Sequence, residues 1–424
     1  MGKNKLKKIL LILGFLLFVV LMAYLIWNFF FKKPVSTPSP EPTPIYDPST
    51  GLPISPEGPG QIIPGIDPGR METSSEIIPP QKYPDPIQDP ATTAPSEIAR
   101  GGITKTKSLV EKKAANVTAS RDGSSLQFYN QDDGRFYLVN NEGDLIPLSD
   151  RVFHNVENVE WAPNKTKAVL EYPDNTKIVY DFSTQKQVTL PKHWEDFSFS
   201  TDSNKLVSKN IGMDPESHWL ITSNADGSQV KYLEYIGKNA DKVISSWSPN
   251  NQTVAMYVKP IDFDRREVFF VGLHDENFRS TIVHGWNFSG TWDENGDRLL
   301  YSVASTDNDL KPNLWIVDAR GDNIGRARTD LKIETWVEKC TFANKDEIYC
   351  AVPTSLPEGA GTMPELAANT HDNLYKINLK TKRKELVAIP DETYNISSLI
   401  LSQDGKTLFF TDRAMGGIHT IKLP

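Results

Sequence analysis

The sequence predicts an all-β protein built from repeats of one unit, with an N-terminal helix and a proline-rich linker before them. Three observations lead to this prediction. A segment pattern recurs seven times beyond residue 100, a proline-rich stretch precedes it, and a long apolar run lies near the start of the chain. The expected boundaries are residues 1–8 for a basic cytoplasmic tail, 9–31 for a transmembrane helix, 32–101 for a disordered linker and 102–424 for the repeats.

The apolar run covers residues 9–31 and has Asn28 as its one strongly polar member. A helix rises about 1.5 Å per residue, so this run spans a hydrocarbon core of about 30 Å. A cleaved signal peptide would have a shorter apolar region that ends in small residues, whereas this run ends in bulky aromatic residues. Four lysines precede the run and two follow it, which predicts a signal anchor with a cytoplasmic N-terminus. The remainder is then expected outside the cell membrane, in a single-pass protein.

The linker holds seventeen of the thirty prolines, between residues 34 and 99. Proline fixes φ and removes an amide donor, so neither a helix nor a sheet propagates through such a segment. Its apolar residues are too sparse to bury a core, which indicates a disordered or polyproline spacer. The alternative is a PxxP ligand for an SH3-like domain, but such domains are mostly cytoplasmic and this segment is expected outside.

The repeat consists of an opening residue, usually aromatic, then turn residues, then an alternating apolar run. Successive copies begin 42, 38, 48, 45, 50 and 59 residues apart, which is the period of a propeller blade. The seven copies are ASRDGSSLQFY at Ala119, WAPNKTKAVLEY at Trp161, FSTDSNKLVSK at Phe199, WSPNNQTVAMYV at Trp247, WDENGDRLLYSV at Trp292, FANKDEIYCAV at Phe342 and LSQDGKTLFFTD at Leu401.

Each copy predicts the end of one strand, a tight turn and the next strand. A second hairpin follows most copies, so each unit makes a four-stranded blade and the chain makes a seven-bladed β-propeller. The last unit ends one strand short at Pro424. Residues 102–113 precede the first unit and can supply that strand, with residues near Ile103–Val110 pairing against His419–Leu423. Closure of the ring in this way removes exposed strand edges.

At these residues the sequence resembles the TolB-type, WD-repeat-like β-propeller family, whose repeat reads approximately W-S-P-D-G-x-x-I-A-F. WSPNNQTVAM from Trp247 matches it best, and the resemblance covers about residues 102–424. It implies the fold and says little of function, because propellers serve as scaffolds, receptors and enzyme domains. The propeller domain of dipeptidyl-peptidase-four-like proteases is also similar, but no G-x-S-x-G motif is present.

Composition narrows the function classes. The net charge is −8 and residues 1–33 carry six lysines and no acid, so the remaining residues have a net charge of −14. An acidic body disfavours nucleic-acid binding. The seven histidines show no H-x-x-x-H spacing and there is no Gly-rich phosphate loop, so no metal and no cofactor is expected. No catalytic constellation stands out, which leads us to expect a protein that is not an enzyme.

The candidate ligand face lies where the connections between blades and between second and third strands emerge. The connections there are long, above all at residues 353–373, and long loops often carry function. Exposed tryptophans on such loops are frequent binding hot spots, although they can also pack beneath the loops. The candidate residues on this face are His193, Trp194, His284, Trp286 and His371.

Cys340 and Cys350 flank the turn of the sixth unit's first hairpin and are the candidate disulfide. Neighbouring antiparallel strands bring such residues within bonding reach, and an extracytoplasmic location permits oxidation. The alternative is a pair of buried free thiols.

The leading functional hypothesis is a membrane-anchored extracytoplasmic module that binds a protein, a peptide or a glycan. Two alternatives remain open. One is a carbohydrate-active enzyme with its site at the channel mouth of the propeller, and the other is a structural protein of the cell surface.

Overall fold

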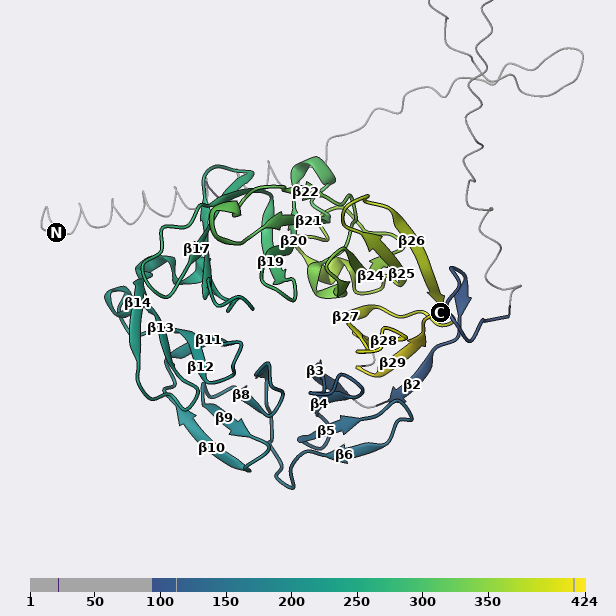
Figure 1. Cartoon of the computed structure of the whole chain (residues 1–424), viewed down its shortest axis with the longest axis horizontal. Coiled ribbons are helices and arrows are strands. Elements are labelled where there is room, and N and C mark those ends of the chain that lie inside the picture. The colour runs from purple at the N-terminus through teal and green to yellow at the C-terminus, as the bar shows by residue number, and fades with distance from the viewer. Residues whose placement is uncertain (1–21, 23–93, 112, 415) are drawn as a thin grey trace, which may run out of the picture. The chain divides into compact units, whose positions relative to one another are not determined.

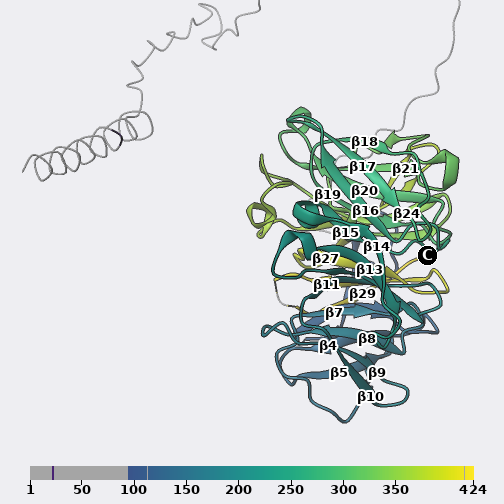
Figure 2. The same cartoon turned by 90° about the vertical axis from the view of Figure 1, so that its left-hand side faces the viewer.

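The computed structural model describes residues 94–111, 113–414 and 416–424, together with Met22. The chain separates into two units, Met1–Gln81 and Lys82–Pro424, and all strands described here belong to the second. Its seven sheets stand around a common centre, and the first strand of each faces the centre (Figure 1). Figure 2 shows the same ring from its edge. The prediction of an all-β, seven-bladed β-propeller is confirmed.

The predicted transmembrane helix at residues 9–31 lies outside the described residues apart from Met22, and so does the linker up to residue 93. Within the part of the chain that the structure describes, no helix is long and apolar enough to cross a membrane.

Blades are numbered in chain order. Blade 1 contains β3 (Ala114–Ala119), β4 (Leu126–Asn130), β5 (Arg135–Val139) and β6 (Leu145–Pro147). Blade 2 contains β7 (Asn158–Trp161), β8 (Lys167–Glu171), β9 (Lys177–Asp181) and β10 (Lys186–Leu190). Blade 3 contains β11 (Trp194–Phe199), β12 (Lys205–Asn210), β13 (Trp219–Asn224) and β14 (Lys231–Tyr235). Blade 4 contains β15 (Val243–Ser245), β16 (Ala255–Pro260), β17 (Arg265–Val271) and β18 (Thr281–His284).

Blade 5 contains β19 (Trp286–Trp292), β20 (Arg298–Ala304), β21 (Pro312–Asp318) and β22 (Thr329–Asp330). Blade 6 contains β23 (Cys340–Asn344), β24 (Glu347–Pro353), β25 (Asp372–Asn378), β26 (Lys384–Pro390) and β1 (Ile103–Thr104). Blade 7 contains β27 (Ile396–Leu401), β28 (Thr407–Asp412), β29 (Ile418–Lys422) and β2 (Lys107–Val110). Short 3-10 helices lie in the connections: η3 (Pro215–Ser217), η4 (Gly237–Lys242), η5 (Thr306–Asn308), η6 (Gly321–Asn323), η7 (Val337–Lys339) and η8 (Pro364–Ala367).

The core lies between the blades because each sheet packs against a neighbour on both faces. All five residues of β4 are buried, and so are six of the seven residues of β20. The repeated tryptophan bridges adjacent blades. The indole Nε1 of Trp161 donates to the carbonyl of Asn116 in blade 1 at 2.8 Å, and that of Trp292 donates to Ser246 Oγ in blade 4 at 2.9 Å.

The turn residues of the repeat also have a shared role. In blade 4, Ser248 Oγ donates to Asn250 Oδ1 at 2.7 Å and accepts the N–H of Thr253 at 2.9 Å. The same pair of bonds recurs around Ser200 in blade 3 and Ser402 in blade 7. A small hydroxyl two residues before Asp or Asn therefore satisfies the turn's polar groups, which is why this pattern recurs in the sequence.

The ring closes with a strand from the N-terminal side of the repeats. β2 pairs antiparallel with β29, with Lys107 opposite Thr420 and Ser108 opposite His419. This confirms that the missing strand of the last blade comes from residues before the first one. One part of the predicted pairing was wrong, because β1 pairs parallel with β26 of blade 6, with Ile103 opposite Ile389. The incoming chain therefore spans two blades.

Candidate functional site

The second-to-third-strand connections of blades 3 to 6 emerge on one side of the ring, and we call them together the loop platform. It consists of residues 211–218, 261–264, 305–311 and 354–371. Hydrogen bonds join the last three of these loops. Thr306 Oγ1 donates to Asp264 Oδ2 at 2.9 Å, and the N–H of Gly361 donates to the carbonyl of Leu310 at 2.8 Å. Asn287 of β19 donates through Nδ2 to the carbonyls of Gly361 and Thr362, which ties the longest loop to the inner strand of blade 5.

Large apolar side chains are exposed on this platform. Phe263 is 75% exposed and Met363 61%, and Ile261, Leu366 and the fully exposed Met213 join them. The other exposed large apolar residues of the propeller lie mostly on its outermost strands. Among the described turns of the opposite side, Val230 beside β14 is the single example. The two sides of the ring therefore differ in character.

A pair of aromatic rings lies at the edge of the platform. The ring of Phe263 meets the indole of Trp286 edge to face, with centroids 4.9 Å apart. The guanidinium of Arg266 lies 5.1 Å from the centre of the same indole and donates to the carbonyl of Gly285 at 2.6 Å. Burial lowers the pKa of Arg266, and the carboxylates of Asp264 and Asp262 oppose that shift. Trp286 is thus half-buried, and Phe263 presents the free aromatic surface.

The predicted site residues are spread over the ring rather than gathered. His193 is exposed before β11, His284 is exposed at the end of β18, and His371 is exposed where the 354–371 loop ends. The ring Nε2 of His371 lies 3.2 Å from Thr354 Oγ1 at the base of that loop. The residues that the sequence missed are Phe263 and Met363, since a lone apolar residue in a loop shows its exposure only once the fold is known.

Trp194 corrects the sequence prediction of an exposed binding residue. It is 4% exposed and belongs to a core cluster between blades 2 and 3. As the first residue of β11 it pairs with Asn210, and its side chain packs against buried neighbours that include Leu190 and Phe197. The preceding His193 is exposed in the turn that leads into β11.

A cleft of about 500 Å³ opens between blades 4 and 5. His284 and Trp315 line it together with Arg328 and Asp330 of the outer edge of blade 5. The guanidinium of Arg328 lies 5.4 Å from the centre of the Trp315 indole, and Asn313 donates to Asp330 Oδ1 at 2.9 Å. Most of the residues that line the cleft are polar, and they include both acidic and basic side chains. Within the described ranges, no group of three or more His, Cys, Asp or Glu side chains could hold a metal ion.

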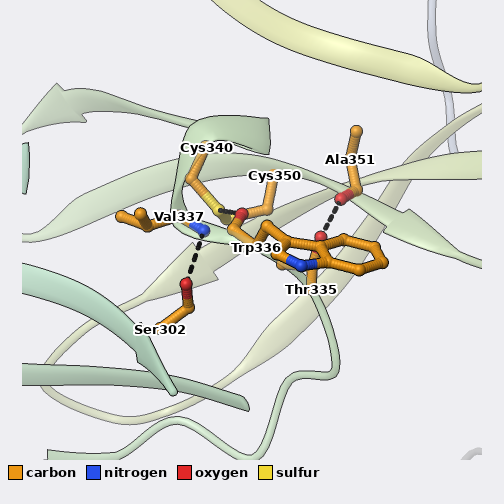
Figure 3. Close-up of a disulfide and its surroundings, with 7 residues drawn as sticks. All are labelled: Ser302, Thr335, Trp336, Val337, Cys340, Cys350 and Ala351. Atoms are coloured by element: carbon orange, nitrogen blue, oxygen red, sulfur yellow. Dashed lines mark hydrogen bonds between the residues drawn. A yellow bond between two sulfur atoms is a disulfide. The ribbon is translucent and has the colours of Figure 1, made fainter. Parts of the chain in front are cut away.

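Cys340 and Cys350 are joined by a disulfide in the structure (Figure 3). They occupy directly opposed positions of β23 and β24, with their Cα atoms 4.1 Å apart. Nearby, Thr335 Oγ1 donates to the carbonyl of Ala351 at 2.6 Å, and the N–H of Val337 donates to Ser302 Oγ at 3.2 Å. The bond therefore lies in the inner hairpin of blade 6, close to the segment that leads in from blade 5.

A titratable cluster surrounds Glu160 of β7, the inner strand of blade 2. Burial raises the pKa of Glu160 on β7 to about 7, and the nearby carboxylates of Asp196 and Glu171 act in the same direction. The ammonium of Lys165 opposes them. Lys165 itself donates to Thr118 Oγ1 of blade 1 at 2.8 Å, and burial lowers its pKa.

Glu160 predicts a pH dependence of stability. Its folded pKa lies above its usual value of 4.5, so its ionisation costs no folding free energy below pH 4.5, an increasing amount up to about pH 7, and a constant amount above that. Glu160→Gln should therefore stabilise the propeller at pH 8, by on the order of 2 kcal/mol, and should have little effect at pH 4.5. Thermal unfolding at both pH values checks this, with the exposed Glu157→Gln as the matched control. An equal change at both pH values would contradict the assignment.

Comparison with known proteins defines the class. No family model and no curated protein matches this sequence. Among solved structures, the β-propeller domain of Myceliophteria thermophila Cps50 (Swd1) has a TM-score of 0.51 at 13% identity, over 75% of this chain and 100% of that one. An oligogalacturonate lyase in complex with manganese has a TM-score of 0.48 at 14% identity, over 75% and 93%. TolB from Acinetobacter baumannii has a TM-score of 0.39 at 11% identity, over 65% and 64%.

The seven sheets and the likeness to the Cps50 (Swd1) domain place the chain in the class of β-propellers, in agreement with the resemblance seen in the repeats. At such identities the likenesses concern the fold and do not assign the chain to a family. The prediction that the protein is not an enzyme does not stand. Oligogalacturonate lyases are among the similar structures, so enzymes occur with this fold and the lack of a sequence motif excludes no activity.

Proposed function

We propose that this chain is an extracytoplasmic binding module whose loop platform holds a protein or peptide partner. One observation carries the proposal, namely the gathering of exposed large apolar side chains on the platform loops while the opposite turns have almost none. Exposed large apolar side chains are costly in water unless a partner covers them, and surfaces rich in them mark interaction sites. Flexible Met363 and Leu366 favour a protein surface over a glycan, which would need flat, accessible aromatic faces.

The platform also has the construction of a binding site. The hydrogen bonds from Asn287 and between the loops hold the 354–371 segment in place, so less conformational entropy is lost when a partner binds. Phe263 packs edge to face against the half-buried Trp286, which Arg266 also contacts, and this support makes Phe263 an aromatic anchor of the kind found at hot spots.

Site-specific photo-crosslinking in the native host tests the proposal. A photoreactive residue at position 263 or 363 of the full chain should give a discrete adduct with one partner. The same residue at Glu294 or Lys406, exposed in turns of the opposite side, serves as the matched control and should give none. Adducts from the control positions alone, or equal adducts from both sides, would show that the platform is not the binding face.

The location is proposed on the sequence of the first 33 residues. The apolar run at 9–31 and the lysines on its two sides support a single-pass anchor with the propeller outside the cell membrane. Protease added to intact cells should then cut within residues 34–93 and release a fragment that contains the propeller. A cytoplasmic marker protein should stay intact in the same sample. Protection of the chain until the cells are lysed would contradict the orientation.

A further inference from the structure

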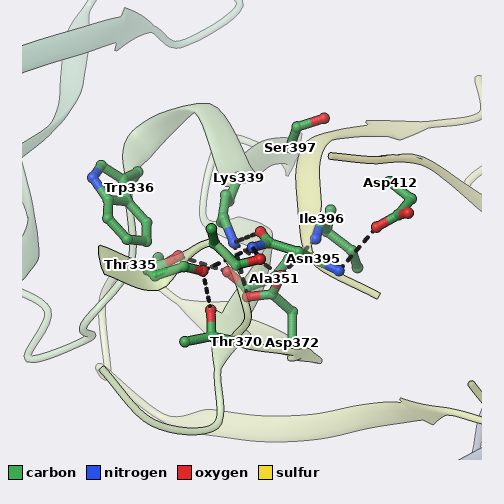
Figure 4. Close-up of polar contacts among 12 residues, drawn as sticks. Thr335, Trp336, Lys339, Ala351, Thr370, Asp372, Asn395, Ile396, Ser397 and Asp412 are labelled. Atoms are coloured by element: carbon green, nitrogen blue, oxygen red, sulfur yellow. Dashed lines mark hydrogen bonds and ion pairs between the residues drawn. The ribbon is translucent and has the colours of Figure 1, made fainter. Parts of the chain in front are cut away.

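Three polar side chains from distant parts of the sequence meet in the interior near the junction of blades 6 and 7 (Figure 4). Lys339 ends η7, Asp372 begins β25, and Asn395 directly precedes β27. All three are buried, at 5%, 1% and 6% exposure respectively. A buried amine, a buried carboxyl group and a buried carboxamide in mutual contact are uncommon, because each loses its hydration.

The contacts give the three groups a defined orientation. Lys339 Nζ lies 3.0 and 2.9 Å from the two carboxylate oxygens of Asp372, and 3.2 Å from Asn395 Oδ1. Asn395 Nδ2 points away from the amine and donates to the carbonyls of Ala367 and Ala368, at 2.8 and 3.0 Å. The carboxamide therefore presents its acyl side to the amine and its leaving nitrogen to the exposed 354–371 loop.

The surroundings keep these groups fixed. The N–H of Ile396 donates to Asp372 Oδ2 at 2.6 Å, and the N–H of Asn395 donates to Asp412 Oδ1 at 3.0 Å. The Lys339 amine also lies 5.4 Å from the centre of the Trp336 indole. A nucleophile and an acyl group held in contact in a water-poor site have the proximity that raises the rate of an intramolecular reaction.

Burial also changes the pKa values of Lys339 and Asp372. It lowers the pKa of the Lys339 amine, against the effect of the Asp372 charge, and it raises the pKa of the Asp372 carboxyl, against the effect of the Lys339 charge. Both directions favour transfer of the proton from the ammonium to the carboxylate. That transfer would give a neutral, nucleophilic amine beside a carboxylic acid that can donate a proton.

We propose that Lys339 and Asn395 form an intramolecular isopeptide bond, with Asp372 as the acid–base group. Asp372 takes a proton from the ammonium, and the neutral amine attacks the side-chain carbonyl carbon of Asn395. The Nζ–Cγ bond forms and the Cγ–Nδ2 bond breaks. The second amine proton and the proton held by Asp372 both pass to the departing nitrogen, so that it leaves as ammonium and Asp372 returns to its carboxylate. No oxidant, reductant or added reactant is needed.

The isopeptide bond would link blades 6 and 7 covalently. It would join residues 56 positions apart, from the segment that enters blade 6 to the segment that enters blade 7, next to the disulfide in β23 and β24. A covalent link across such a separation constrains the unfolded chain, as a disulfide does, but it persists in reducing conditions. Blade 7 is also the blade that closes the ring, so the isopeptide bond would stabilise the closed ring.

Mass spectrometry of the full chain purified from its host tests the proposal. After denaturation and reduction, a tryptic digest should contain residues 333–345 joined to residues 385–406, because the modified Lys339 no longer permits cleavage. The joined peptide should weigh about 17 Da less than the sum of its parts, the mass of one ammonia. Asn395→Ala and Lys339→Arg should give unjoined peptides, and Asp372→Asn should give largely unjoined ones.

Separate peptides of full mass from the wild-type chain would overturn the proposal by themselves, even where a variant fails to fold. A loss of about 18 Da with the link at Asp372 would show that Asp372 is the acyl group, and would overturn the assignment to Asn395. Complete linkage in a folded Asp372→Asn variant would overturn the acid–base assignment.

Discussion

A chain that lacks residues 94–110 is expected to lose cooperative folding of the propeller. The deletion removes β1 and β2, and with them the buried side chains of Leu109 and Val110 and the ladder bonds to β29. Burial of two such side chains and several hydrogen bonds together contribute on the order of 5–10 kcal/mol. That is comparable to the whole stability of a domain, and it leaves β29 as an exposed edge.

Thermal unfolding followed by circular dichroism measures this effect. The matched control lacks residues 34–93, which precede the described part of the propeller, and should unfold at the same temperature as the full chain. An unchanged unfolding temperature after deletion of 94–110 would show that the ring holds together without its closing strand.

Trp194→Ala is expected to destabilise the fold by about 3–5 kcal/mol, the usual cost when a buried large aromatic side chain is removed. The indole fills the space between blades 2 and 3, where Leu190 and Phe197 pack in the same cluster, and alanine would leave a cavity. The half-buried Trp286 is the matched control, and Trp286→Ala should cost much less stability while weakening binding at the platform. Urea unfolding of both variants measures the difference. Equal small losses would contradict the assignment of Trp194 to the core.

Much of the fold can be predicted from the sequence, because each copy of the repeat specifies its structure through residues that are close together in the chain. Trp247, Ser248 and Asn250 interact within one turn or with the adjacent blade. Consecutive residues of each copy therefore specify one strand end and one turn. The closure was also predictable, because the chain ends one strand short and has spare residues before the first blade. The position of β1 beside β26 was not, since two residues with no turn signal can pair with any free edge.

The residues of the candidate site were harder to predict from the sequence than the fold. Trp194 and Trp286 both follow a polar stretch and begin the first strand of a blade, yet one is buried and the other is half-buried. Side-chain burial depends on the strand face on which a residue lies and on the blade that packs against that face. The adjacent residues in the sequence determine neither of these two features. For the same reason the loops that form the platform could be predicted by their length, whereas Phe263 and Met363 could not be singled out.

The number of blades, the order of strands within each hairpin and the opposed positions of Cys340 and Cys350 could be predicted from the sequence, because periodicity, turn chemistry and hairpin register are local properties. The packing of the blades, in contrast, determines which tryptophan is buried and which loops expose large apolar side chains. It also brings Lys339, Asp372 and Asn395 into one buried site. These three residues stand far apart in the chain. Their contact exists because blades 6 and 7 pack side by side, and the free energy of that packing comes from burial summed over whole sheets rather than from any short stretch of sequence.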